Sequence, residues 1–133
     1  MGKVAVVTGA GSGIGRGVAK RLAREGYMVG MLDISGEAVK LASEEISSEG
    51  HQSLALTCDV SDRLAVASCL DQIRANFGPI ECMIACAGIS EFVPFTELTP
   101  EVWDRMLRVN LTSMFHCIQL AIPDMIEAGW GRI

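Results

Sequence analysis

Residues 8–15 read Thr-Gly-Ala-Gly-Ser-Gly-Ile-Gly, and the alternating glycines allow the backbone to turn tightly. A short apolar run, Val4-Ala5-Val6-Val7, precedes this turn, and a helical pattern from Ile14 to Arg24 follows it. Free N–H groups and the positive dipole at the start of a helix favour a phosphate. The segment therefore predicts a buried strand, a phosphate-binding turn and a helix in succession.

The same alternation of strand and helix continues along the chain. Further strands are predicted at Tyr27–Leu32, Leu54–Cys58 and Ile80–Ala87. Ser35, Ser61 and Thr99 are the expected caps of helices that end near Ser48, Phe77 and Ala128, and Gly26 and Gly50 are helix stops. Pro123 is expected to kink or break the last helix, and Arg132-Ile133 resembles the start of another strand.

This order of elements predicts the α/β class, with a doubly wound parallel sheet of Rossmann type. Residues 1–133 are expected to form one domain that is incomplete at its C-terminal end. A parallel sheet normally covers a strand as apolar as the fourth with a further neighbour, so the sheet is expected to be truncated after this strand and the helix that follows it.

Composition excludes several classes of protein. The 133 residues carry a net charge of -5, which disfavours nucleic acid and anionic lipid as partners. Half of the residues are hydrophobic, yet no apolar span of about 20 residues is present, so we expect no membrane helix. Five cysteines without a Cys-x-x-Cys pair, and no signal-peptide pattern, indicate a reduced, cytoplasmic protein without a metal site.

The pattern Thr-Gly-x-x-x-Gly-x-Gly between a strand and a helix resembles the N-terminal part of the classical short-chain dehydrogenase/reductase family. The resemblance covers the whole chain and implies an NAD(P)-dependent oxidoreductase. It assigns cofactor contacts in the turn to Gly9, Ser12, Gly13, Ile14 and Gly15. A glycine-rich turn without a ligand is the alternative.

Asp33 ends the second predicted strand, 18 residues after Gly15. A carboxylate there can accept hydrogen bonds from both hydroxyls of an adenosine ribose, and it would repel the extra phosphate of NADP. Ser12 and Ile34 stand where NADP-preferring relatives often carry a basic residue. The resemblance therefore implies NAD in preference to NADP. The alternative for Asp33 is a helix cap or a loop carboxylate.

Two further segments follow strand ends. By the resemblance, Asp59 hydrogen-bonds the adenine and Val60 lines its pocket, with a loop or capping aspartate as the alternative. Residues 85–88 read Ala-Cys-Ala-Gly where the family usually reads Asn-Asn-Ala-Gly. Ala87 and Gly88 match and would let the cofactor pass close to the backbone. Cys86 is a cofactor contact by position, but it replaces an asparagine that normally ties down the strand.

Asn110 matches the family's helix asparagine, which implies a catalytic role through a water linked to the catalytic lysine. The alternative is a polar residue that bends the helix. The family's catalytic serine, tyrosine and lysine have no counterparts here, because Tyr27 is the only tyrosine and no lysine follows it at the required spacing. We therefore expect this chain alone to be inactive.

Three functions follow from these residues. The first is part of an enzyme that transfers a hydride between nicotinamide and a small carbonyl or alcohol, by resemblance a 3-oxoacyl-thioester reductase or a 3-hydroxybutyrate-type dehydrogenase. The family also implies a homo-oligomer through the last helix, with Met114, Phe115 and Ile118 as candidate contacts. The second is a short, non-catalytic protein that binds a nucleotide or a partner. The third, half of an S-adenosylmethionine methyltransferase, is disfavoured by Thr8 and the Gly13-Ile14-Gly15 opening.

Overall fold

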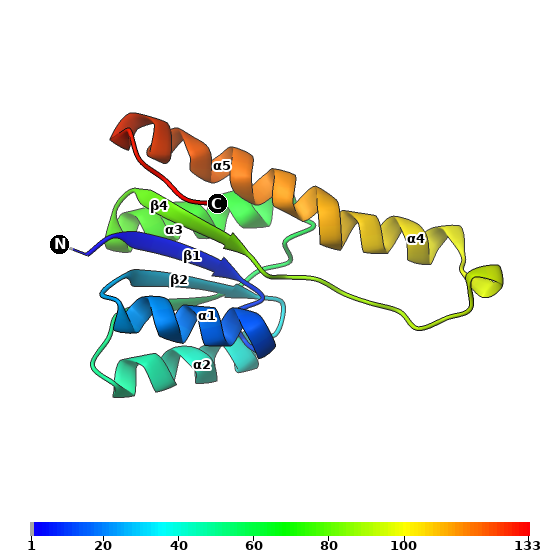
Figure 1. Cartoon of the computed structure of the whole chain (residues 1–133), viewed down its shortest axis with the longest axis horizontal. Helices are drawn as coiled ribbons and strands as arrows, with labels where there is room; N and C mark the ends of the chain where they lie inside the picture. Colours follow the sequence, from blue (N-terminus) through cyan, green and yellow to red (C-terminus); the bar gives the residue numbers. More distant parts are fainter. Residues whose placement is uncertain (1) are drawn as a thin grey trace.

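The computed structural model describes residues 2–133, which form a parallel four-stranded sheet with helices on both faces (Figure 1). The strands are β1 (Val4–Thr8), β2 (Met28–Asp33), β3 (Ser53–Thr57) and β4 (Ile80–Ala85). Their order across the sheet is β3-β2-β1-β4. The chain runs from β1 outward to β3 and then returns to the other side of β1, so the predicted α/β class and doubly wound sheet are confirmed.

The helices follow the predicted alternation. They are α1 (Gly13–Arg24), α2 (Gly36–Ser48), α3 (Arg63–Phe77), α4 (Pro100–Leu107) and α5 (Ser113–Ala128), with a 3-10 turn η1 (Phe95–Glu97) and a π-helical turn η2 (Arg108–Thr112). Within residues 2–133, no helix has the length and apolar character that crossing a bilayer requires. The segment from the end of β4 to α4 extends beyond the carboxyl ends of the strands (Figure 1).

Strand β1 lies at the centre of two cores, and all five of its residues are buried. Val4 and Val6 belong to the core under α3 and α5, whereas Val7 belongs to the core under α1 and α2. Successive side chains of a strand point to opposite faces of the sheet, so β1 must be apolar throughout. Burying each valine stabilises the fold by about 1.5–3 kcal/mol.

Two of the three predicted helix caps are confirmed. The Ser35 hydroxyl accepts a hydrogen bond from the Ala38 N–H, and the Thr99 hydroxyl accepts one from the Val102 N–H, both at 3.3 Å. The prediction that Ser61 caps the third helix is wrong. Asp62 caps α3 instead, because its carboxylate accepts hydrogen bonds from the N–H groups of the two residues that follow Arg63.

The break predicted as one alternative at Pro123 does not occur, because α5 continues through the proline to Ala128, and the alternative of a kink stays a prediction. The irregular helical turn lies instead in η2, directly before α5. Two hydrogen bonds hold α5 on either side of the proline: Arg74 donates to the Leu120 carbonyl at 2.7 Å and to Asp124 Oδ2 at 2.9 Å. These contacts from α3 secure the turn in which a proline lacks its own N–H.

Beyond α5, Arg132 pairs in parallel with Cys82 of β4. The Arg132 N–H donates to the Glu81 carbonyl at 3.0 Å, and the Met83 N–H donates to the Arg132 carbonyl at 2.9 Å. The expectation that Arg132-Ile133 begins another strand is confirmed as far as this single bridge.

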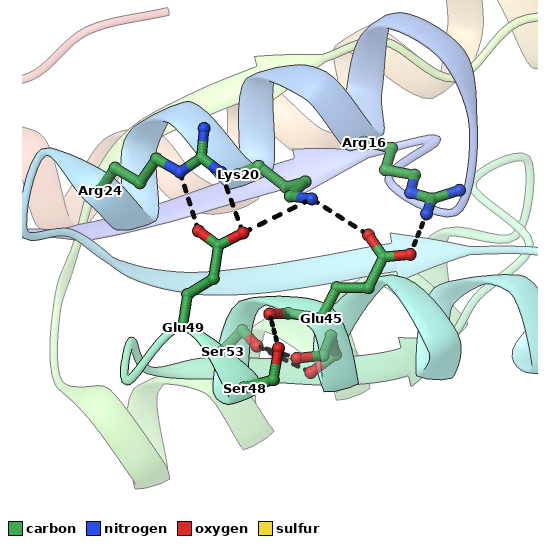
Figure 2. A network of polar contacts seen from close by, with 8 residues as sticks. Arg16, Lys20, Arg24, Glu45, Ser48, Glu49 and Ser53 are labelled. Carbon is green, nitrogen blue, oxygen red and sulfur yellow. Dashed lines mark hydrogen bonds and ion pairs between the residues drawn. The ribbon is translucent and has the colours of Figure 1, made fainter.

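A network of ion pairs joins α1 to α2 (Figure 2). Arg16 and Lys20 both donate to Glu45, and Arg24 donates to Glu49 through two nitrogens at 2.8 and 2.9 Å. Lys20 also lies 3.7 Å from Glu49, so it bridges the two carboxylates. Hydrogen bonds from Lys20 and Arg24 hold the pKa of Glu45 and Glu49, respectively, below the usual value for glutamate.

Because the pKa of Glu49 is lower in the folded state than in the unfolded state, its contribution to stability is complete above the unfolded pKa of about 4.3. That contribution is lost as the pH falls through the folded pKa. We expect Glu49→Gln to lower the thermal midpoint near pH 7, with the difference from wild type closing as the pH falls through the folded pKa of Glu49. Glu44→Gln is the control, because Glu44 pairs only with Lys40 of its own helix, at 3.9 Å. If the thermal midpoints of Glu49→Gln and wild type still differ at low pH, the stabilisation by Glu49 is not electrostatic.

Asp124 connects three elements, since its Oδ2 accepts hydrogen bonds from Arg74 of α3 and, at 2.8 Å, from the Ile80 N–H of β4. Its side chain is only 16% exposed. We expect Asp124→Ala to lower the free energy of unfolding by about 1–3 kcal/mol, because it leaves a backbone N–H and a guanidinium without their acceptor. Denaturant unfolding measures this change. Asp71→Ala is the control: it removes the exposed partner of the same arginine and should cost less than about 0.5 kcal/mol.

Candidate functional site

A cleft of about 370 Å³ opens at the carboxyl ends of β1 and β4, where the strand order reverses. Open parallel sheets bind ligands at this point. The cleft is lined by all of the predicted cofactor contacts: Gly9, Ser12, Gly13, Ile14, Gly15, Asp33, Asp59, Val60, Cys86, Ala87 and Gly88. It is also lined by Ile34, Cys58, Ile89 and Val109. Residues from four strand ends therefore meet in one cavity.

The glycine turn forms the floor of this cleft. Gly9 has a φ of +65°, and a Cβ there would lie 3.0 Å from the backbone N and Cα of Ala87. A Cβ on Gly15 would lie 2.2 Å from the Gly9 carbonyl oxygen. Ser12, Gly13 and Ile14 are exposed at the start of α1, where the first N–H groups of the helix face no carbonyl of their own helix. This cradle fits a phosphate group of a dinucleotide.

Asp33 stands at the end of β2, half-buried at the edge of the cleft. Its Oδ2 accepts a hydrogen bond from the Gly11 N–H and its Oδ1 accepts one from the Ser35 N–H, both at 2.9 Å. The carboxylate thus hydrogen-bonds the loop backbone, as the alternative prediction for Asp33 had it. A carboxylate can accept about four hydrogen bonds, so two remain for ligand hydroxyls.

Asp59 and Val60 form the wall that follows β3. Asp59 is exposed, and its Oδ1 accepts hydrogen bonds from the N–H and the hydroxyl of Ser61, at 3.0 and 2.7 Å. Val60 is buried, with its carbonyl 3.2 Å from Nδ1 of His116. The Asp59 carboxylate therefore stabilises this turn through Oδ1, and its Oδ2 takes no part in these two bonds.

Thr8 is a site residue whose role the sequence did not reveal. It is buried, and its Oγ1 accepts a hydrogen bond from the Ala87 N–H at 3.1 Å. This bond joins the ends of β1 and β4 directly beneath the cleft. A buried threonine at the end of an apolar strand is the signal that could have indicated it.

The surroundings of Cys58 and Cys86, the two cysteines of the cleft, disfavour the thiolate form. A hydrogen bond with Cys69 and burial together raise the pKa of the Cys58 thiol, and burial raises that of Cys86. A thiol must ionise to attack a substrate or to bind a metal. Among residues 2–133, no three His, Cys, Asp or Glu side chains are grouped so as to hold a metal ion.

Comparison with known proteins identifies the family. The family model described as short chain dehydrogenase matches residues 3–133. The chain belongs to the short-chain dehydrogenase/reductase family. This membership overturns the methyltransferase alternative.

Two relatives and one solved structure illustrate the similarity. The chain is 36% identical to 2-dehydro-3-deoxy-L-rhamnonate dehydrogenase (NAD(+)) of Sphingomonas, covering 99% of the chain and 52% of that protein. It is 35% identical to 3-oxoacyl-acyl-carrier-protein reductase FabG of Staphylococcus aureus, covering 100% of the chain and 54% of that protein. The crystal structure of F189W actinorhodin polyketide ketoreductase with NADPH matches with a TM-score of 0.95 and 30% identity, covering 99% of the chain and 51% of that structure. The chain thus spans about half the length of the relatives it matches.

Asn110, the predicted catalytic residue, lies in η2 and is not part of the cleft wall. Its Oδ1 accepts a hydrogen bond from the Ile89 N–H at 2.7 Å, and its Nδ2 donates to the Ile89 carbonyl at 2.8 Å. Ile89 itself lines the cleft. The Asn110 side chain thus fixes the segment after β4, and π-helical turns such as η2 often occur at functional sites.

The only tyrosine, Tyr27, precedes β2 at its amino end, whereas the cleft lies at the carboxyl end of the sheet. It cannot reach a ligand in the cleft. Within residues 2–133, no tyrosine lines the cleft.

We expect Thr8→Val to destabilise the protein by about 1–3 kcal/mol, because it keeps the shape of the side chain but leaves the half-buried Ala87 N–H without an acceptor. Amide hydrogen exchange at Ala87 should become faster. Thr8→Ser is the matched control, since it retains the hydroxyl and should keep this protection. Equal protection in the valine and serine variants would exclude the proposed tie between β1 and β4.

Proposed function

We propose that this chain is the NAD-binding domain of an oxidoreductase that transfers a hydride between nicotinamide and a carbonyl or hydroxyl group of a small molecule. The observation that carries this proposal is the position of the Asp33 carboxylate in the same cleft as the glycine cradle. A phosphate cradle and a ribose acceptor are the two groups that a dinucleotide requires. The bound cofactor supplies the hydride chemistry, and the chain supplies binding and orientation.

NAD rather than NADP is the proposed cofactor. One relative is named as an NAD(+) enzyme and one similar structure contains NADPH, so family membership leaves both open. The local charge supports NAD: Asp33 lines the cleft, and none of the described residues that line it is lysine or arginine. Arg16, the nearest basic residue in the turn sequence, is paired with Glu45 of α2. A 2′-phosphate would thus meet a carboxylate with no compensating cation.

The proposed substrate class is a 3-oxoacyl or 3-hydroxyacyl compound, supported by the similarity to the Staphylococcus aureus reductase. Asn110 is proposed as the one catalytic-site residue of the family that this chain carries, acting by positioning Ile89 and the backbone around it. Because the serine, tyrosine and lysine have no counterparts in the sequence, we propose that the 133-residue chain binds the cofactor without turnover.

A second candidate is a non-catalytic nucleotide-binding or partner-binding protein, which the same cleft would serve. Binding of NADH by this chain without oxidation in the presence of a 3-oxoacyl thioester fits both candidates. Restoration of activity when the C-terminal half of a relative is supplied would favour the enzyme.

The proposed partner is a second copy of the chain. Met114 and Phe115 of α5 are 39% and 55% exposed, and Ile118 is half-buried on the same helix. Apolar side chains gathered on one helix face are typical of a subunit interface. A cytoplasmic location is proposed from the reduced state of the five cysteines.

Asp33→Ala tests the proposed function. We expect the affinity for NADH to fall about ten- to a hundredfold, because hydrogen bonds to a charged acceptor contribute about 1.5–3 kcal/mol. The affinity for NADPH should stay level or rise, because the repulsion of its extra phosphate is removed. Fluorescence titration with each dinucleotide measures both constants.

Glu37→Ala is the control for this titration. It removes one negative charge from the first turn of α2 without touching the cleft, so both affinities should be unchanged. Unchanged titrations for Asp33→Ala with both dinucleotides would exclude Asp33 as the ribose acceptor.

A further inference from the structure

Gly11 lies between the cradle and Asp33, and it is buried. Its N–H donates to Asp33 Oδ2 at 2.9 Å. A Cβ built on Gly11 would lie 2.9 Å from the same Oδ2 and 2.9 Å from the Cβ of Ala38 in α2. Real Cβ atoms essentially never approach other heavy atoms so closely, so any side chain at position 11 must displace both of these neighbours.

The constraint at Gly11 differs from that at the other glycines of the turn. Gly9 and Gly15 face backbone atoms, and Gly13 has a φ of +53°. Gly11 is not among the glycines with positive φ, so alanine suits its backbone conformation. The cost of a side chain there comes from the collision with Asp33 and Ala38.

Of the two neighbours, Asp33 moves more easily. The Ala38 Cβ is attached directly to the backbone of α2, which is capped by Ser35 and anchored by the buried Val39. The Asp33 carboxylate is the free end of a side chain and can rotate. Rotation would break its bond to the Gly11 N–H and shift the oxygens that face the cleft.

We propose that Gly11 is a specificity-determining residue: the absence of a side chain at this position seats the Asp33 carboxylate where it recognises the unphosphorylated ribose. This inference rests on the proposed NAD-binding function. Gly11 touches no ligand in this account and acts only through Asp33, as a positioning residue. Its loss should therefore affect NAD more than NADP, because only recognition of the free ribose hydroxyls depends on the carboxylate.

The test is Gly11→Ala, titrated with NADH and NADPH and checked by circular dichroism for folding. We expect the dissociation constant for NADH to rise about tenfold, the loss of a hydrogen bond to a charged group. The constant for NADPH should change by less than about threefold. Gly17→Ala is the matched control, because a Cβ on this glycine of α1 meets no atom within 4 Å and should alter neither constant.

The double variant Gly11→Ala/Asp33→Ala separates positioning from general damage to the turn. Without the carboxylate, Gly11→Ala should cause no further loss of NADH affinity, so the two changes should be non-additive. If Gly11→Ala lowers the folded fraction, the double variant should regain part of it, because the collision with Asp33 is gone and only the contact with the Ala38 Cβ remains. A further loss of NADH affinity in the double variant, relative to Asp33→Ala alone, would overturn the inference.

The remaining outcomes are equally decisive. An equal loss of NADH and NADPH affinity in Gly11→Ala would show that the phosphate cradle itself is distorted, and unchanged affinities would show no effect on Asp33; either result overturns the inference while the proposed function stands. A wild-type chain that binds neither dinucleotide would overturn both.

Discussion

The structure depends on the close approach of the glycine turn after β1 to the backbone that follows β4. Only a residue without a Cβ fits at Gly9, because Ala87 lies against it, and the Thr8 hydroxyl joins the same two segments by a hydrogen bond. This contact sets the distance between the two strands at their carboxyl ends. The cleft exists because α1 starts on one side of that junction and the chain after β4 leaves on the other.

Each layer around the sheet is secured by polar contacts at its outer edge. On one face, Lys20 bridges Glu45 and Glu49 between α1 and α2. On the other, Arg74 and Asp124 tie α3 to α5 and to the first residue of β4. Each exposed ion pair between α1 and α2 contributes little to stability. Asp124 also accepts a hydrogen bond from a backbone N–H, so its removal should lower the free energy of unfolding by more.

The cleft shows how side chains combine structural and ligand-binding roles. Asp33 holds the turn through Gly11 and the start of α2 through Ser35, and so it is oriented before any ligand arrives. Such preorganisation lowers the entropic cost of binding. Cys86 stands where relatives commonly carry an asparagine, yet the flanking backbone is fixed on both sides, at Ala87 by Thr8 and at Ile89 by Asn110.

The sequence by itself determined the class of fold, the order of elements and the ends of most helices. Apolar runs of strand length, glycine stops and the caps at Ser35 and Thr99 act over a few neighbouring residues, so local chemistry is enough to predict them. It also indicated the residues that line the cleft, because they follow strand ends that a parallel sheet brings to one edge.

How these residues are held follows from contacts between distant segments. Arg74 donates to Leu120 and Asp124 on either side of Pro123, 49 positions later in the chain. The partners of Thr8 and Asn110, and the collision that forbids a side chain at Gly11, likewise join segments that are distant in sequence. Such contacts depend on packing distances between elements, which no local pattern of residues encodes.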